Sequence, residues 1–127
     1  MTLFEQQLRE LEARFPDAKW RQLASGAHLI TVPGVALPKI GWNATETTIE
    51  FVAPVGYPLA NPDCFWADAS LRLASNAMPQ GTNVAAIPET TEPRLWFSWH
   101  VQNNWNPSTN TLLTYFGVIR TRLDPAR

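Results

Sequence analysis

The stretch "TTIEFVAPVGYPLANPDCFWAD", residues 47–68, decides the fold of this chain. In its first part Ile49, Phe51 and Ala53 face one way and the residues between them face the other, which is the pattern of a strand with one buried side. Prolines and a glycine then interrupt the chain, and residues 63–68 are predicted to form a second, short strand. Successive short strands with such turns favour an antiparallel sheet.

Two segments before this stretch complete a predicted four-stranded antiparallel meander. Residues 20–25 are a short strand candidate, and residues 28–34 are rich in β-branched side chains and end in Pro-Gly. Residues 41–44 offer a further segment that can pair before the strand at residue 47. Residues 75–94 are rich in Pro, Thr and Asn and show no hydrophobic period, so we predict a long irregular loop there.

An amphipathic helix is predicted at the beginning of the chain. Thr2 and Glu5 form a capping-box pattern, in which a hydroxyl and a carboxylate satisfy the first backbone N–H groups. Apolar side chains then recur at helical spacing until Pro16 ends the segment. This apolar stripe consists of Phe4, Leu8, Leu11 and Phe15.

A second helix is predicted after Pro107, with Ser108 or Thr109 as its capping residue. Gly117 lies inside this helix and costs about 1 kcal/mol relative to alanine, so we expect a neighbouring element to approach closely there. Helices at both ends and strands between them predict an α+β fold in which the helices pack on the sheet. The helical spacing is carried by Leu112, Phe116, Ile119 and Leu123.

The composition is typical of one small globular domain that covers residues 1–127. A formal net charge of −1 gives no electrostatic reason to expect nucleic acid or an anionic membrane surface as a partner. No apolar run approaches the roughly 20 residues of a membrane span, and the first residues lack the apolar core of a secretory signal. One cysteine makes no internal disulfide, so we expect a cytoplasmic protein.

Cys64 is interpreted as a buried structural residue. A reactive thiol needs a neighbouring base or a positive field, whereas the sequence neighbours of Cys64 are Asp63, Phe65 and Trp66. A nearby carboxylate raises the pKa of a thiol, and free cysteine is among the most buried residue types. In a strand Cys64 shares a face with Trp66. A reactive Cys64 stays open as an alternative.

The segment "LWFSWHVQNNWNPS", residues 95–108, is the candidate for a polar site. It contains three tryptophans, one histidine, one glutamine and three asparagines. His100 is a candidate general base or nucleophile, and a hydrogen-bonded core histidine is the structural alternative. A Ser-His-Asp triad has no supporting nucleophile-elbow pattern. No histidine and cysteine stand at metal-ligand spacing and no glycine-rich phosphate loop is present, so we expect neither a metal nor a cofactor.

The order of these features resembles the ubiquitin-conjugating (UBC-like) fold, which has a leading helix, a four-stranded antiparallel meander, a catalytic loop and further helices. Tyr57-Pro58 and Asn61-Pro62 lie where that superfamily has a proline-rich turn after its third strand. Trp105 begins a "WNPS" sequence like the one that opens the next helix in the family. The runs "FWAD…LRLA" and "WFSWH…W-x-P…LLTY" are similar to the prokaryotic conjugating-enzyme branch called family E.

This resemblance implies a component of a bacterial ubiquitin-like modification system. The partners that it implies are an activating enzyme and a ubiquitin-like protein, together with a JAB-type isopeptidase in the same pathway. The chain departs from the family at the catalytic position. Counting back from Trp105, the cysteine of the family falls at about residues 97–98, where this chain has none. The His-Pro-Asn triplet is also missing, and Asn76 is its nearest equivalent.

The first hypothesis is a conjugating-type enzyme with altered chemistry. His100 and Ser98 are the polar residues that inherit the site, with His100 as an acyl acceptor or general base. Amide side chains would donate hydrogen bonds to the developing oxyanion. These amides are Gln102, Asn103 and Asn104.

The second hypothesis is a non-catalytic UBC-like module that binds a ubiquitin-like protein or its activating enzyme. The missing cysteine motivates it, and exposed tryptophans would provide the binding anchors. The residues assigned to binding are Trp96, Trp99, Trp105 and Asn76.

Overall fold

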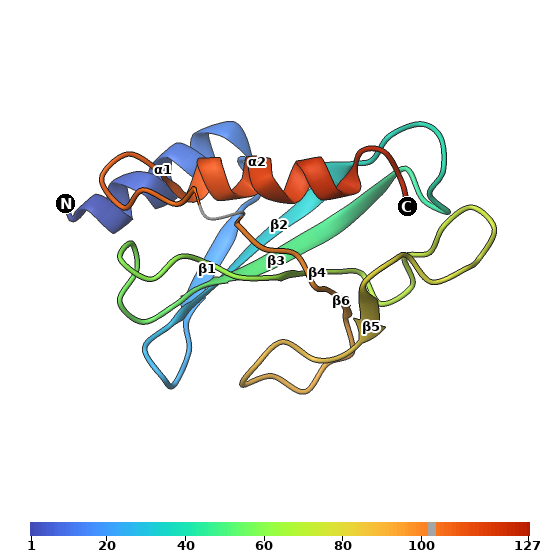
Figure 1. Ribbon diagram of the computed structural model, residues 1–127. Helices are drawn as coiled ribbons and strands as arrows, with labels where there is room; N and C mark the ends of the chain where they lie inside the picture. The colour runs from blue at the N-terminus through green and yellow to red at the C-terminus, as the bar shows by residue number, and fades with distance from the viewer. Residues whose placement is uncertain (102–103) are drawn as a thin grey trace.

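The computed structural model describes residues 1–101 and 104–127. Two helices, α1 (Leu3–Arg14) and α2 (Leu112–Leu123), lie side by side on one face of a six-stranded antiparallel sheet (Figure 1). This arrangement confirms the predicted α+β, UBC-like architecture of helix, sheet and helix. Neither helix in the described part of the chain is long and apolar enough to cross a membrane.

The predicted meander is present, and the sheet extends beyond it. Its first four strands follow one another in space as they do in the chain, while the last two change places, so the order is β1-β2-β3-β4-β6-β5. The strands are β1 (Lys19–Gln22), β2 (His28–Ala36), β3 (Glu46–Ala53), β4 (Phe65–Ala67), β5 (Thr82–Val84) and β6 (Leu95–Phe97).

The prediction of residues 75–94 as wholly irregular was wrong, because β5 lies inside them. β5 pairs with β6 from Thr82↔Phe97 to Val84↔Leu95. Only three residues form this strand, so it has no periodicity of its own, and the neighbouring strand stabilises it. The guanidinium of Arg122 also holds the chain just before β5, since it donates to the backbone oxygen of Gln80 at 2.7 Å.

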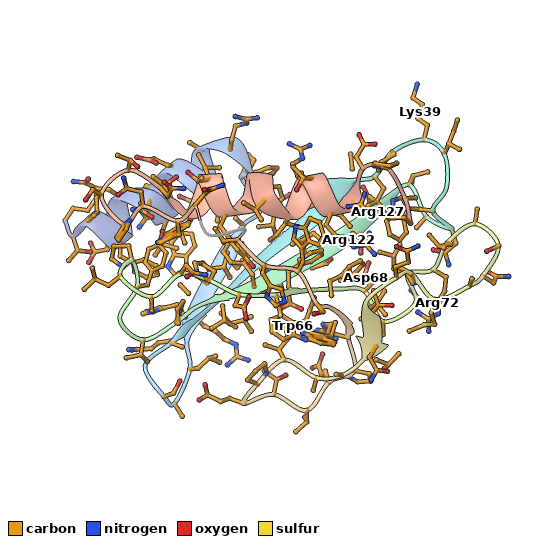
Figure 2. All side chains as sticks on the ribbon, in the orientation of Figure 1. Lys39, Trp66, Asp68, Arg72, Arg122 and Arg127 are labelled. Carbon is orange, nitrogen blue, oxygen red and sulfur yellow. The ribbon has the colours of Figure 1, made fainter. Side chains whose placement is uncertain are left out.

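Arg122 is an unusual buried cation in this position. Its side chain runs from α2 toward the sheet (Figure 2), is 3% exposed, and lies 5.0 Å above the centre of the Phe97 ring. Burial lowers the pKa of Arg122 to about 10, and the nearby charge of Arg127 adds to the effect. A cation over an aromatic ring and hydrogen bonds to backbone oxygens partly offset the cost of burying it.

Residues 41–43 pair, as the sequence suggested, but outside the sheet. The Asn43 N–H donates to the oxygen of Arg72, the Ala74 N–H donates to that of Gly41, and Trp42 bridges Leu73 between them. The indole N–H of Trp42 also donates to the backbone oxygen of Leu123 at 2.9 Å, and its ring is buried. The segment therefore fastens the end of α2 and does not extend the sheet.

The core lies between the helices and the sheet, as the alternation in β3 predicted. Ile49, Phe51 and Ala53 are at most 1% exposed on the helix side. On the opposite face a second apolar cluster contains Cys64 and Trp66, and Trp66 is visible below the sheet in Figure 2. Both faces of the central strands are thus covered, one by helices and the other by the segment that carries Ile87.

Helix α1 begins at the predicted N-cap and ends where predicted, but only the hydroxyl half of the predicted capping box is present among the described residues. The Thr2 hydroxyl accepts a hydrogen bond from the Glu5 backbone at 3.1 Å, and the helix stops before Pro16. Leu8 and Leu11 are buried against the core. Gln7, which is 3% exposed, also accepts a hydrogen bond from the first N–H of α2. This side chain therefore joins the beginnings of both helices.

Helix α2 begins later than predicted, and neither Ser108 nor Thr109 caps it. The cap is Thr111, which exchanges hydrogen bonds with Thr114 in a reciprocal capping box. The side chain of Asn106 accepts the N–H of Ser108 at 2.9 Å and so stabilises a separate turn. That local hydrogen bond competes with helix formation at residues 107–109.

The expected reason for Gly117 was wrong. A Cβ atom added at Gly117 would meet no heavy atom of the described residues within 4 Å, so no neighbouring element approaches it closely. The residue lies on the exposed side of α2. Packing against the described residues therefore does not offset the cost of Gly117 in helix stability.

We predict that Gly117→Ala raises the free energy of unfolding by about 1 kcal/mol, because alanine has the higher helix propensity and the added methyl group meets open space. Urea denaturation monitored by tryptophan fluorescence measures the change. Gly26→Ala is the matched control and should destabilise, since Gly26 has a φ of +98°. A lower stability of Gly117→Ala would contradict the open environment.

Candidate active site

The pairing of β4 with β6 creates the candidate site. Phe65 faces Phe97 at the end of this ladder. The N–H of Cys64 donates to the backbone oxygen of Trp99 at 2.9 Å and continues the pairing past the ends of the strands. Two segments about 35 residues apart in the sequence therefore lie next to each other here.

His100 is held between a carboxylate and a hydroxyl. Its Nδ1 lies 2.5 Å from Oδ1 of Asp63, and its Nε2 lies 3.5 Å from Oγ of Ser98. In the neutral imidazole that carries its proton on Nδ1, this proton donates to the carboxylate and the lone pair of Nε2 faces the hydroxyl. The side chains of His100 and Asp63 are 56% and 59% exposed, so a large molecule can reach them from solvent.

The structure brings together two of the predicted site residues, Ser98 and His100, and adds Asp63. In the sequence, Asp63 stands out only as a carboxylate next to Cys64. The signal that identifies Asp63 is the strand pairing. Phe65 lies opposite Phe97, and the Cys64 N–H then bonds the oxygen of Trp99, one residue further along, so position 63 comes next to position 100. That register is not visible from local patterns. A Ser-His-Asp arrangement is thus formed without a nucleophile-elbow motif.

Cys64 is buried, as predicted, with 8% of its surface exposed. It does not lie within a strand, however. It precedes β4 and has a φ of 61°, in the left-handed region. Its carbonyl accepts the Tyr115 hydroxyl at 2.6 Å. Its predicted placement on the face of Trp66 is confirmed by their shared apolar cluster.

The environment of Cys64 keeps its thiol protonated. Burial raises the pKa of the Cys64 thiol, and the charge of Asp63 raises it further, while N–H donors of Trp99 and Trp96 act in the opposite direction. A basic residue is nonetheless close in space. One ligand atom from each of Asp63, Cys64 and His100 lies within 4.8 Å of the others.

The tryptophans of the segment anchor it to the protein. The indole N–H of Trp99 donates to the oxygen of Val118 at 3.0 Å, and that of Trp105 donates to the oxygen of Pro58 at 2.8 Å. Trp96, Trp99 and Trp105 are all only partly exposed, and no tryptophan of this chain falls among its exposed residues. The exposed tryptophan surface expected for a binding module is therefore not present.

Asn76 is not brought to the cluster. It has a φ of 72° in a turn, and the preceding Ala74 N–H donates to the oxygen of Gly41. In Figure 1 this turn lies near the C-terminus of the chain. Of the other amides, Gln102 and Asn103 lie outside the described residues, so their predicted role as oxyanion donors stays a prediction.

A groove begins beside His100 and runs along α2. It has a volume of about 420 Å³ and a largely apolar lining, and Asn104 contributes a polar group at its edge. On the side of the groove formed by α2, Gly117 has no side chain and leaves the groove open. The groove is lined by Trp99, His100, Val101, Gly117, Val118 and Thr121, among others.

Comparison with known proteins identifies one family. Residues 5–126 match the sequence model described as prokaryotic E2 family E. No curated protein and no solved structure matches the chain. The family match covers nearly the whole chain, including both segments that form the site.

We predict that Cys64 reacts slowly with a thiol reagent in the native protein and quickly after denaturation. The raised pKa lowers the thiolate fraction at a given pH, and burial limits access. Ellman's reagent at several pH values measures the rate, which should rise as the pH is increased. Native labelling as fast as that of a free cysteine at neutral pH would contradict the raised pKa.

Proposed function

The chain belongs to prokaryotic E2 family E, and on that premise we propose that it transfers the C-terminal acyl group of a ubiquitin-like protein through Asp63, His100 and Ser98. Membership in this E2-like family implies interaction with a ubiquitin-like protein and its activating enzyme. The observation that carries the proposal is the orientation of His100, whose Nδ1 is hydrogen-bonded to Asp63 while Nε2 faces Ser98.

The reaction requires an acyl donor and a nucleophile. In the proposed step Oγ of Ser98 attacks the carbonyl carbon of a thioester carried by the activating enzyme, and Nε2 of His100 takes the hydroxyl proton. The C–S bond then breaks, and the leaving thiolate receives that proton from His100. The product is an oxyester on Ser98. An amine of the modified protein then attacks the ester carbonyl, the C–O bond to Ser98 breaks, and His100 carries the amine proton to the Ser98 oxygen.

The position of Ser98 supports this assignment. The resemblance placed the nucleophile of the family at about residues 97–98, and Ser98 is the residue there that has a hydroxyl group. Its distance of 3.5 Å from His100 is long for a hydrogen bond, as is common before a donor is bound. Asp63 would act by fixing the ring and stabilising the imidazolium as it forms.

The groove beside His100 is the proposed binding place for the tail of the ubiquitin-like protein. An extended tail of small residues fits this apolar groove of about 420 Å³, which is open at Gly117 because glycine has no side chain. Asn104 at its edge is available to hydrogen-bond the tail or the oxyanion. We propose that the reaction takes place in the cytoplasm and that a JAB-type isopeptidase reverses it.

A non-catalytic binding module is the second candidate. The observation that favours it is the burial of Cys64, which raises the pKa of its thiol and disfavours a thiolate nucleophile. In that case the apolar groove, and not a tryptophan surface, would hold the ubiquitin-like protein. The two candidates differ in whether a covalent adduct forms.

We predict that the activating enzyme, the ubiquitin-like protein and ATP produce an adduct with this chain that resists thiol reductants and is cleaved by hydroxide. His100→Ala should slow its formation by about a hundredfold or more, because the general base is lost. Ser98→Ala should abolish it. Gel electrophoresis and intact-protein mass spectrometry provide the measurement.

The controls separate the possible nucleophiles. Cys64→Ala should still form the adduct, and His28→Ala, which changes the other histidine of the chain, should react like the wild type. An adduct that thiols cleave and that Cys64→Ala abolishes would contradict the role of Ser98. Calorimetric binding without any adduct would favour the binding module instead.

We predict that Gly117→Leu weakens binding of the ubiquitin-like protein and does not lower the free energy of unfolding. Leucine is a good helix former, so the helix tolerates it, but its side chain fills the groove next to Val118. Isothermal titration calorimetry should give a Kd increased by about tenfold or more for Gly117→Leu. Gly117→Ala, with a much smaller side chain, is the matched control, and equal affinities for both variants would place the tail elsewhere.

A further inference from the structure

Three different metal-binding groups meet at one end of the β4–β6 ladder. Asp63 provides a carboxylate oxygen, Cys64 a sulfur and His100 an imidazole nitrogen, and these atoms lie within 4.8 Å of one another. In a regular strand two successive side chains point to opposite faces. The left-handed φ of 61° at Cys64 breaks that alternation, so the neighbouring Asp63 and Cys64 both reach His100.

The dimensions are close to those of a tetrahedral zinc site. Zinc binds sulfur at about 2.3 Å, and nitrogen and oxygen at about 2.0–2.2 Å, so its ligand atoms stand about 3–4 Å apart. The backbone of Cys64 is fixed by hydrogen bonds to Trp99 and Tyr115. The side chains of Asp63 and His100 are more than half exposed and can rotate to complete the site around the fixed sulfur.

The charges also favour a divalent cation. A thiolate and the Asp63 carboxylate would contribute two negative charges, and no lysine or arginine is ion-paired to Asp63 among the described residues. The thiol as it stands is protonated because burial raises its pKa. A bound cation reverses that preference, since metals bind the deprotonated sulfur and displace its proton to solvent.

We infer that Asp63, Cys64 and His100 form a Zn²⁺ site with three protein ligands and an open fourth position. This inference replaces the expectation, drawn from spacing along the chain, that no metal binds. It further implies that Zn²⁺ inhibits acyl transfer, because the metal occupies the imidazole that would act as the base. That second part rests on the proposed function, while the site itself does not.

Cobalt substitution tests the site directly on the full-length chain, without any partner protein. Titration of the reduced wild-type protein with Co²⁺ should produce a thiolate-to-cobalt charge-transfer absorption that saturates at one equivalent and disappears when Zn²⁺ is added. Cys64→Ala should eliminate this absorption. His100→Gln and Asp63→Asn should each weaken Co²⁺ binding by about tenfold or more.

The controls make the result specific. His28→Gln should bind Co²⁺ like the wild type, because the other histidine of the chain is not a ligand. Circular dichroism verifies that each variant is folded, and the exposed His100 and Asp63 variants keep the test valid if Cys64→Ala is unstable. No charge-transfer absorption in the wild type, or a Co²⁺ affinity of His100→Gln equal to that of the wild type, would overturn the site.

The adduct assay separates this inference from the proposed function. In the presence of a chelator the wild type should form the adduct, and added Zn²⁺ should lower the rate of adduct formation. Zn²⁺ should lower the rate of Cys64→Ala by a smaller factor. If the adduct forms at the same rate with and without Zn²⁺, only the proposed inhibition is overturned. Cobalt binding without any adduct would overturn the proposed transfer and leave the metal site in place.

Discussion

The antiparallel pairing of β4 with β6 is the interaction on which the site depends. Each strand has only three residues, so neither is stable by itself. The pair is stabilised from the helix side, where the rings of Phe65 and Phe97 stack with their centres 4.5 Å apart. Tyr115 of α2 then hydrogen-bonds the carbonyl of Cys64. Packing of α2 therefore determines the position of the residues that precede β4.

This pairing places a rigid scaffold next to side chains that remain accessible. The backbone of Cys64 is buried and bonded on both sides, whereas His100 and Asp63 project from the end of the ladder and are more than half exposed. Hydrogen bonds donated by the indole N–H groups of Trp99 and Trp105 hold the segment after β6 against the rest of the protein. Rigid support for exposed reactive groups is the arrangement that catalysis requires.

Much of the fold could be predicted because its signals are local. The capped first helix and the two faces of β3 follow from patterns with periods of 3.6 and 2 residues, and both were confirmed. The start of α2 was missed because the Asn106 turn and the Thr111 cap compete within six residues. The close approach predicted at Gly117 was also wrong. A glycine inside a helix indicates a loss of helix stability, but the sequence does not show whether packing offsets that loss.

The sequence by itself determined the candidates for a site, which are one cysteine and His100 within a polar segment, and a family resemblance that the family match confirmed. Only the tertiary structure decided which of them meet. Asp63 and His100 are 37 positions apart, and no local pattern encodes the register that joins them. That register depends on burial of Phe65 and Phe97 beneath α2, which is a property of the whole core. Hydrophobic periodicity is a local property of the chain, whereas the neighbours of an exposed side chain are set by long-range packing.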